Sequence, residues 1–284
     1  MTIYLSKKIN GLAPLSKEYD IEVLDDEGCC SIKKVGVLNL MPTKCETETQ
    51  ILRLLCETGE NLKVEFIRLD SYKPKNIPYE YLMENYRSFD EVKENLDILI
   101  VTGAPLEKMD FDEVDYITEL RGVLDYSKLN IQKSLFICWG AQVALNHFYS
   151  IRKVLTKEKI FGVFSHEILN GDEILSGIEG GFRAPHSRHT ELSKEDLKNC
   201  NKLKLISVTE EGQEHLLRGE FNDYYILGHI EYDEESLKKE YVRDLKKGLE
   251  INKPKGYFVN DNIDEGIRFD WRKDAIKFYK NLIK

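Results

Sequence analysis

The sequence predicts an α/β fold with a mostly parallel, doubly wound sheet that is covered by helices on both faces. First, short apolar runs typical of buried strands alternate with longer segments whose apolar residues recur at helical spacing. Second, 42% of the 284 residues are hydrophobic, which is enough for a sizeable core. Third, no Pro-rich linker, internal repeat or low-complexity tract divides the chain. We therefore expect residues 1–284 to form a single domain.

The predicted strands are short apolar runs, each bounded by polar or turn-forming residues. They are residues 35–40, 64–69, 96–102, 134–137, 203–208 and 224–227. The predicted helices have apolar residues three or four positions apart. They are residues 47–57, 111–126, 140–149, 234–249 and 270–283. Residues 151–200 contain five glycines and are less regular, so we expect an irregular insertion there with some antiparallel strand.

The charge and composition of the chain exclude some function classes. The formal net charge is −9 and the pI is about 5.4, which argues against a general nucleic-acid surface. No apolar run reaches transmembrane length, and the first residues lack the apolar core of a signal peptide. The six cysteines form no Cys-x-x-Cys pair. We expect a cytoplasmic protein with reduced thiols that binds neither a membrane nor nucleic acid.

One cysteine is a candidate nucleophile because of its position. Cys138 follows the apolar run 134–137 and precedes the small-residue helix 140–149. A sharp turn from strand to helix exposes the side chain at the junction. The first N–H groups of the helix stabilise both a thiolate and an oxyanion. The alternative is a buried structural cysteine, which is the commoner role of a free thiol.

A second segment contains residues that could activate this thiol. Gly228 allows a turn after the predicted strand 224–227, and His229 and Glu231 share one face if the chain there is extended. A thiol nucleophile needs a general base, and the base needs a group that orients it. Cys138, His229 and Glu231 would fill these roles in that order. The alternative is a surface histidine beside a surface glutamate.

Several motifs together carry a resemblance to a known family. The main ones are Cys-Trp-Gly-Ala-Gln at 138–142 and Gly-His-Ile-Glu-Tyr-Asp at 228–233. Further matches are residues 37–50, 102–107, 159–164, 184–190 and 240–244. In this order, the set resembles the homoserine O-acyltransferases of methionine biosynthesis, whose fold is similar to that of class I glutamine amidotransferases. One departure is Ile230, where the family usually has proline, and isoleucine keeps an N–H group that proline lacks.

The resemblance implies a two-stage, ping-pong acyl transfer. Cys138 would attack the thioester of an acyl-CoA, and His229, oriented by Glu231, would then deprotonate the hydroxyl group of homoserine. The resemblance places the backbone N–H of Trp139 in the oxyanion hole, with a second donor from the loop after residues 35–40. It implies no cofactor besides the acyl-CoA substrate, and it leaves a homodimer open.

The resemblance also assigns the binding of homoserine to Lys159, Ser187 and Arg243. A guanidinium suits the carboxylate of homoserine because it can bind two oxygens at once. Without the resemblance, Arg243 would be interpreted as part of a surface ion pair. Ser187 would then be a turn hydroxyl and Lys159 an ordinary solvent-facing lysine.

Two further patterns receive no role in this chemistry. His186 and His189 are three residues apart, but no nearby cysteine or third histidine completes a zinc set, so we expect no metal site. The pairs Lys238-Lys239 and Lys246-Lys247 are interpreted as the solvated face of a helix.

Glu107 is the candidate determinant of the acyl group. At this position of the family motif, Glu resembles the acetyl-specific members and Gly the succinyl-specific ones. A carboxylate here would repel the terminal carboxylate of a succinyl group, at a cost of roughly 4 kcal/mol for charges about 4 Å apart and an effective dielectric near 20. The alternative is a solvent-facing glutamate at a helix start, although Asp110 is better placed for that role.

We therefore expect an acetyl-transferring member of this family. The first alternative is a succinyl-transferring member with the same machinery. The second is a cysteine-dependent glutaminase or hydrolase, because the Cys-His-Glu order is shared with amidotransferases. Those enzymes typically have Gly two residues before the nucleophile, where this chain has Phe136. The third is a binding or regulatory protein that kept the fold, and the intact Cys-His-Glu set argues against it.

Overall fold

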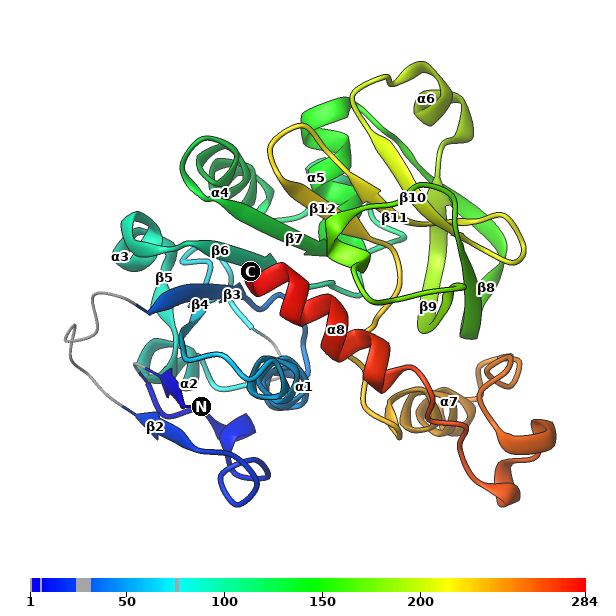
Figure 1. Cartoon of the computed structure of the whole chain (residues 1–284), viewed down its shortest axis with the longest axis horizontal. Coiled ribbons are helices and arrows are strands. Elements are labelled where there is room, and N and C mark those ends of the chain that lie inside the picture. Colours follow the sequence, from blue (N-terminus) through cyan, green and yellow to red (C-terminus); the bar gives the residue numbers. More distant parts are fainter. Residues whose placement is uncertain (1, 6, 24–31, 75–76) are drawn as a thin grey trace.

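The computed structural model describes residues 2–5, 7–23, 32–74 and 77–284, and it contains one 12-stranded sheet (Figure 1). The strands are β1 (Ile3–Leu5), β2 (Ile21–Val23), β3 (Lys33–Leu38), β4 (Leu62–Arg68), β5 (Arg87–Ser88), β6 (Ile98–Val101), β7 (Lys133–Ile137), β8 (Lys153–Ile168), β9 (Phe182–Leu192), β10 (Lys204–Thr209), β11 (Glu214–Arg218) and β12 (Asp223–Ile226). Their order is β2-β1-β4-β3-β6-β7-β12-β11-β10-β8-β9, with β5 beside β4. Neighbours from β2 to β12 are parallel, and those from β12 to β9 are antiparallel.

Helices cover both faces of this sheet (Figure 1). The helices are α1 (Lys44–Glu57), α2 (Tyr79–Asn85), α3 (Phe89–Val92), α4 (Ile117–Asn130), α5 (Trp139–Tyr149), α6 (Lys194–Asn199), α7 (Ser236–Lys246) and α8 (Arg272–Ile283). One buried cluster joins α1 and α8 to the sheet, and a second joins α4 and α5 to the opposite face. In β7, Leu135 and Ile137 belong to the first cluster and Phe136 to the second, as expected for a strand buried on both sides. The predicted mostly parallel, doubly wound sheet is confirmed.

All the strands and helices expected from apolar patterns are present, with boundaries that differ by a few residues. The largest difference concerns the helix predicted at 111–126. There a 3-10 turn, Phe111–Glu113, is separated from α4, and Asp110 and Glu113 close that turn with a reciprocal capping box. The short elements β1, β2, β5, β11, α2, α3 and α6 were not predicted, because few apolar residues mark each of them.

The expectation of an irregular insertion at 151–200 was wrong in part. This region contains β8 and β9, the two longest strands of the described chain, which pair as an antiparallel hairpin. A register shift interrupts the pairing between Leu155 and Ile160. Four of the five glycines lie in the connection between the strands, at 171–181, so the irregular composition belongs to the turn. The antiparallel strand content was predicted correctly.

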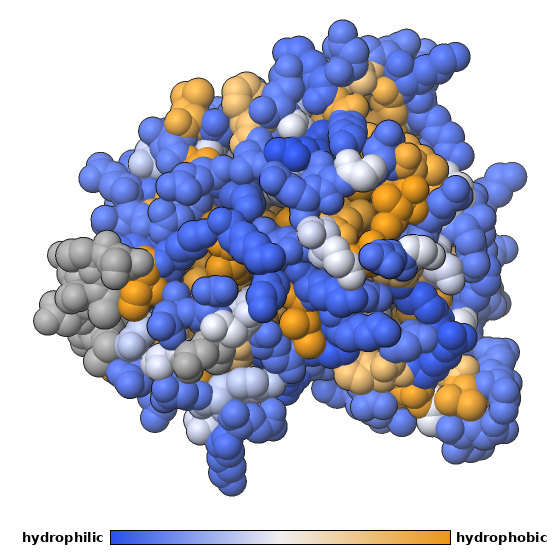
Figure 2. Space-filling model, viewed as in Figure 1, coloured by the Kyte–Doolittle hydropathy of each residue, from blue (hydrophilic) through white to orange (hydrophobic). Residues whose placement is uncertain are grey.

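The surface and the thiols fit the composition. Hydrophilic residues predominate on the face drawn in Figure 2, and hydrophobic ones form small patches among them. Within the described residues, no helix is both long and apolar enough to cross a membrane. Cys45, Cys56, Cys138 and Cys200 are free thiols, whereas Cys29 and Cys30 lie outside the described residues.

Candidate active site

Cys138 stands at the turn between β7 and α5. Its φ of 51° and ψ of −114° belong to a backbone conformation that residues other than glycine rarely adopt. Its own N–H donates a hydrogen bond of 2.7 Å to the carbonyl oxygen of Ile226 in β12, which ties the turn to the neighbouring strand. Such strained residues gather at functional sites, where the surrounding structure holds them in place. The predicted junction of strand and helix is therefore present, and it fixes the direction of the thiol.

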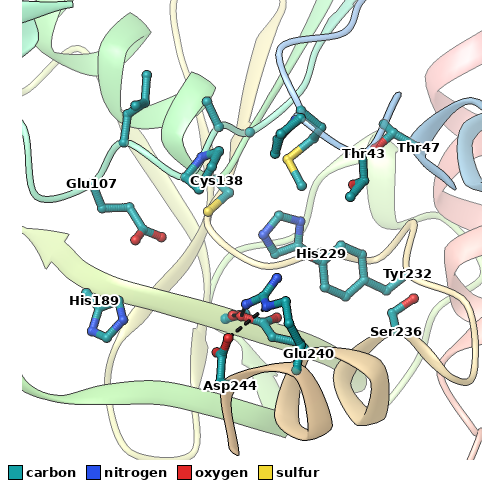
Figure 3. A pocket seen from close by; sticks show the side chains of 18 of the residues that line it. Thr43, Thr47, Glu107, Cys138, His189, His229, Tyr232, Ser236, Glu240 and Asp244 are labelled. Atoms are coloured by element: carbon teal, nitrogen blue, oxygen red, sulfur yellow. Dashed lines mark hydrogen bonds and ion pairs between the residues drawn. The ribbon is translucent and has the colours of Figure 1, made fainter. Parts of the chain in front are cut away.

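His229 and Glu231 form a buried pair beside this thiol (Figure 3). The Nδ1 atom of His229 and the Oε1 atom of Glu231 are 2.7 Å apart. The chain is not extended here as expected: β12 ends at Ile226, and the N–H of Tyr232 donates to the carbonyl oxygen of His229 across a turn. The turn still brings the two side chains together, so the predicted pairing occurs for a different geometric reason.

The electrostatic environment favours the protonated form of His229. Burial alone would lower the pKa of its imidazole, but the negative charges of Glu231 and Cys138 and the hydrogen bonds to both residues outweigh this effect. The pKa of His229 is therefore raised well above its ordinary value. Glu231 and Cys138 thus both stabilise the protonated form of the imidazole.

Three contacts hold His229 in this position. Its N–H donates a 2.8 Å hydrogen bond to the carbonyl oxygen of Pro185 in β9. The ring of Tyr232 stacks on the imidazole, with centroids 4.2 Å apart and planes at 14°. Gly228 lies so close to β9 that a Cβ there would be 2.9 Å from the Pro185 oxygen. Ile230, between the two residues of the pair, is buried in the core.

The loop after β6 lies against Cys138 and His229. A Cβ placed on Gly103 would lie 3.3 Å from the Cβ of Cys138 and 3.5 Å from the Cε1 of His229. In the loop after β3, where we expected a second oxyanion donor, the first three N–H groups already have partners, and that of Asn39 donates to the carbonyl oxygen of Ile67 at 3.3 Å. The N–H of Leu40 donates to Thr102 Oγ1 at 2.8 Å, and the N–H of Met41 donates to Asn39 Oδ1 at 3.1 Å.

A cavity of about 540 Å³ opens in front of Cys138, and we call it the Cys138 pocket. Residues 41–50, the loop 103–109, the β8–β9 hairpin, the turn at 229–232 and helix α7 line it (Figure 3). The three residues expected to bind homoserine, Lys159, Ser187 and Arg243, all lie in this lining. They come from β8, β9 and α7, which are distant in sequence.

These three side chains converge on Glu240. Its Oε1 atom lies 2.7 Å from Lys159 Nζ, accepts a 2.9 Å hydrogen bond from Ser187 Oγ, and lies 3.5 Å from an amino nitrogen of Arg243. The Nε of Arg243 donates to Asp244 Oδ1 at 2.7 Å. Sequence reasoning gave no role to Glu240 and Asp244. Their spacing of four residues on a predicted helix was the signal, because it places both carboxylates on one face.

Glu107 points into the same pocket from the loop after β6 (Figure 3). Burial raises the pKa of its carboxyl group, while the positive charges of His229 and Lys159 act in the opposite direction. Asp110, and not Glu107, closes the 3-10 turn that follows. Asp110 thus stands at the start of the turn as expected, and Glu107 lies in the pocket lining, while its effect on the acyl group stays a prediction.

Sequence comparisons identify the family to which this chain belongs. A family model described as homoserine O-succinyltransferase matches residues 18–284. The chain belongs to the homoserine O-succinyltransferase family. A relative from Bacillus cereus, named homoserine O-acetyltransferase, is 43% identical over 253 residues, covering 88% of this chain and 84% of the relative. A relative from Acetivibrio thermocellus with the same name is also 43% identical, with coverage of 88% and 83%. The resemblance inferred from the motifs is confirmed.

Solved structures confirm the fold expected for this family member. A glutamine amidotransferase from Thermotoga maritima superimposes with a TM-score of 0.58, at 11% identity, over 88% of this chain and 96% of its own. A glutamine amidotransferase from Methylobacillus flagellatus has a TM-score of 0.54, at 10% identity, over 90% and 93% of the two chains. These similarities concern the fold alone.

Next to Gly228, near the Cys138 pocket, lies a histidine cluster that the sequence did not predict. His166, His186 and His215 come from β8, β9 and β11, and their ring nitrogens lie within 4.8 Å of one another. His186 thus has two histidine neighbours in space, which corrects the expectation that no third histidine is near. Burial lowers the pKa of all three, and the nearby guanidinium of Arg188 acts in the same direction. That buried positive charge opposes the entry of a metal cation, so the absence of a metal site stays our prediction.

Proposed function

We propose that the protein is a homoserine O-acetyltransferase that works through an acetyl-cysteine intermediate. The observation that carries this proposal is the strained Cys138 beside the buried His229–Glu231 pair, at the base of the pocket that contains Glu107. The names of the two relatives support both the acceptor and the acetyl donor. The donor and homoserine would enter the same pocket in turn.

In the first stage, the thiolate of Cys138 attacks the carbonyl carbon of acetyl-CoA. The oxyanion that forms is stabilised by the N–H of Trp139, the first residue of α5. The backbone at Gly103 is the better candidate for a second donor than the loop after β3, since it lies against Cys138. The C–S bond to CoA then breaks, and the imidazolium of His229 gives its proton to the leaving thiolate. An acetyl-cysteine and a neutral imidazole remain.

In the second stage, homoserine is the nucleophile. The acetylated sulfur carries no charge, so one of the charges that raise the pKa of His229 is gone. The neutral imidazole accepts the proton of the homoserine hydroxyl as its oxygen attacks the acetyl carbon. The bond between that carbon and the Cys138 sulfur then breaks. O-acetylhomoserine leaves, and the thiolate and the imidazolium are restored.

The charged groups around Glu240 suit the zwitterionic head of homoserine. Glu240 and Asp244 can accept hydrogen bonds from its ammonium group, while Lys159 and Arg243 can bind its carboxylate. Without substrate, these groups compensate one another through the ion pairs described above. The binding of homoserine would exchange those internal pairs for pairs with the substrate.

One experiment tests the covalent proposal directly. The purified protein is incubated with acetyl-CoA alone and analysed by intact and peptide mass spectrometry. We expect one added acetyl group on the peptide with Cys138, and its loss when homoserine is added. A glutaminase or a binding protein would gain no acetyl group. Formation of O-acetylhomoserine without any acetyl-enzyme would contradict the two-stage mechanism.

Replacing Arg243 by Lys should weaken homoserine binding selectively. Lysine keeps the charge but loses the two-pronged geometry, so we expect the KM for homoserine to rise on the order of tenfold. The rate of acetyl-enzyme formation, measured from the release of CoA without homoserine, should change little. If acetyl-enzyme formation is impaired as strongly as the use of homoserine, Arg243 does not act through homoserine binding alone, and this assignment is wrong.

Glu107 should decide between acetyl and succinyl donors. Wild-type protein is expected to prefer acetyl-CoA, and Glu107→Gly should increase the use of succinyl-CoA because it removes both a carboxylate and side-chain volume. Glu107→Gln keeps nearly the same volume, so a similar gain in that variant would assign the selectivity to charge. The measurement is kcat/KM for both donors in all three proteins. A wild type that prefers succinyl-CoA would overturn the acetyl assignment.

The raised pKa of Glu107 adds a pH dependence to this selectivity. Protonation removes the repelling charge, and the raised pKa means that it begins at a higher pH than for an ordinary glutamate. The preference of the wild type for acetyl-CoA should therefore weaken as the pH falls. In Glu107→Gln the ratio of the two kcat/KM values should not change with pH in this way.

A further inference from the structure

Helix α7 presents two parallel stripes of side chains to the Cys138 pocket. Ser236, Glu240 and Asp244 are spaced by four residues and form an inner stripe that faces the catalytic pair (Figure 3). Lys239, Arg243 and Lys247 have the same spacing and form an outer stripe. The inner stripe is largely buried, whereas the side chains of Lys239 and Arg243 are 65% and 54% exposed. The outer stripe therefore lies at the mouth of the pocket.

The two lysine pairs lie on the solvated face of the helix as expected, but they differ in their relation to the pocket. Lys239 and Lys247 line the pocket, whereas Lys238 and Lys246 are not part of the described lining. A step of one residue turns a side chain by about 100° around a helix, so only one lysine of each pair can face the mouth. Lys238 pairs instead with Glu235 at 3.5 Å.

The mouth of the pocket suits a ligand that has an anionic group at one end and an apolar chain attached to it. Lys108, from the loop after β6, adds a further cation to the lining. The exposed apolar side chains of Met109 and Leu249 also line this pocket. The whole chain has a net charge of −9, but a local cluster of cations attracts anions whatever the total charge. Arg243 is held by Glu240 and Asp244, which leaves the two lysines of the stripe to face outward.

We propose that Lys239 and Lys247, together with Lys108 from the loop after β6, bind the phosphate groups of the acyl-CoA donor. This inference rests on the proposed function, because it concerns the donor of that same reaction. The two lysines lie about 12 Å apart along the helix, so they can contact different phosphates of one molecule. Lys239 pairs with Glu46 at 3.2 Å, and an exposed pair of this kind is weak enough to exchange for a phosphate. The thioester would then lie inward, beside Cys138.

Donors of different length test this assignment. Acetyl-CoA carries all the phosphates, acetyl-dephospho-CoA lacks the 3′-phosphate, and acetyl-pantetheine carries none. The double variant Lys239→Ala/Lys247→Ala should raise the KM for acetyl-CoA by about ten- to a hundredfold. Its KM for acetyl-pantetheine should stay within about twofold of the wild type. In the wild type, the KM for acetyl-dephospho-CoA should lie between those for acetyl-CoA and acetyl-pantetheine if only one of the lysines contacts the 3′-phosphate.

The neighbouring lysines supply a matched control. Lys238→Ala/Lys246→Ala removes the same number of charges from the same helix and should leave the KM for every donor unchanged. Equal effects of the two double variants would overturn the assignment, and so would an equal rise in KM for acetyl-CoA and acetyl-pantetheine in the target variant. A wild type that transfers succinyl instead of acetyl would contradict the proposed donor only, since the same comparison can be made with succinyl-CoA and succinyl-pantetheine.

Ionic strength provides an independent measurement. Salt screens the attraction between exposed charges, so kcat/KM for acetyl-CoA should fall as salt is added to the wild type. The slope of that fall should be smaller in Lys239→Ala/Lys247→Ala and unchanged in the control double variant. For acetyl-pantetheine, the slope should be the same in all three proteins. A wild-type slope that equals the slope of the target variant would contradict phosphate binding by these lysines.

Discussion

Replacement of Cys138 by Ala is expected to abolish acyl transfer and leave the fold intact. The substitution removes only the sulfur, and the backbone strain at this position is the same for both residues. Other thiols in the described chain are poorly suited to replace it. Burial raises the pKa of Cys56 to about 12 and also raises that of Cys45, so both stay protonated at neutral pH. We expect turnover to fall by about 10⁴-fold or more.

Two measurements separate loss of chemistry from loss of structure. Thermal unfolding and circular dichroism of Cys138→Ala should match the wild type, while no acetyl group is retained after incubation with acetyl-CoA. Cys200→Ala is the matched control, since Cys200 lies outside the Cys138 pocket, and it should transfer acetyl groups normally. Turnover within tenfold of the wild type in Cys138→Ala would end the covalent mechanism.

The fold could be predicted where one face of an element is strongly apolar. Strands such as β7 are buried on both sides and appear as continuous apolar runs, and helices such as α4 repeat their apolar residues at helical spacing. The β8–β9 hairpin was harder, because most residues of β8 before Ile160 are partly or fully exposed and carry no clear apolar alternation.

The candidate residues Cys138 and His229 could be singled out from the sequence because each follows a buried apolar strand, whereas Glu231 was added only through its spacing from His229. The charged groups around Glu240 could not be assembled from local patterns. Lys159 and Ser187 reach it from β8 and β9, and only the tertiary fold brings the three together. The histidine cluster was missed for the same reason, since His166 and His215 are 49 positions apart in the printed sequence.

His229→Ala should reduce both half-reactions by orders of magnitude, with the larger loss in the transfer to homoserine. Acetyl-CoA has a good leaving group, so the first stage depends less on the proton that His229 donates. A hydroxyl group needs a base, and in the described pocket lining the other imidazole is that of His189, which has no described contact with Cys138. Rapid-mixing measurements of CoA release and of acetyl-enzyme decay resolve the two stages. A variant whose acetyl-enzyme decays with homoserine as fast as the wild type would contradict the role of base.

The two stages should depend on pH in opposite directions, because each needs a different form of His229. The first uses the imidazolium, so its rate should fall as the pH rises through the raised pKa of the free enzyme. The second uses the neutral imidazole, so its rate should fall as the pH drops below the pKa in the acetyl-enzyme. That pKa should be the lower of the two, since acetylation removes the charge of Cys138. Glu231→Gln removes another charge that raises the pKa of His229. The pH at which each stage loses its rate should therefore be lower in this variant. If chemistry limits each stage and the pH dependence of both rates is unchanged in Glu231→Gln, Glu231 does not control the protonation of His229.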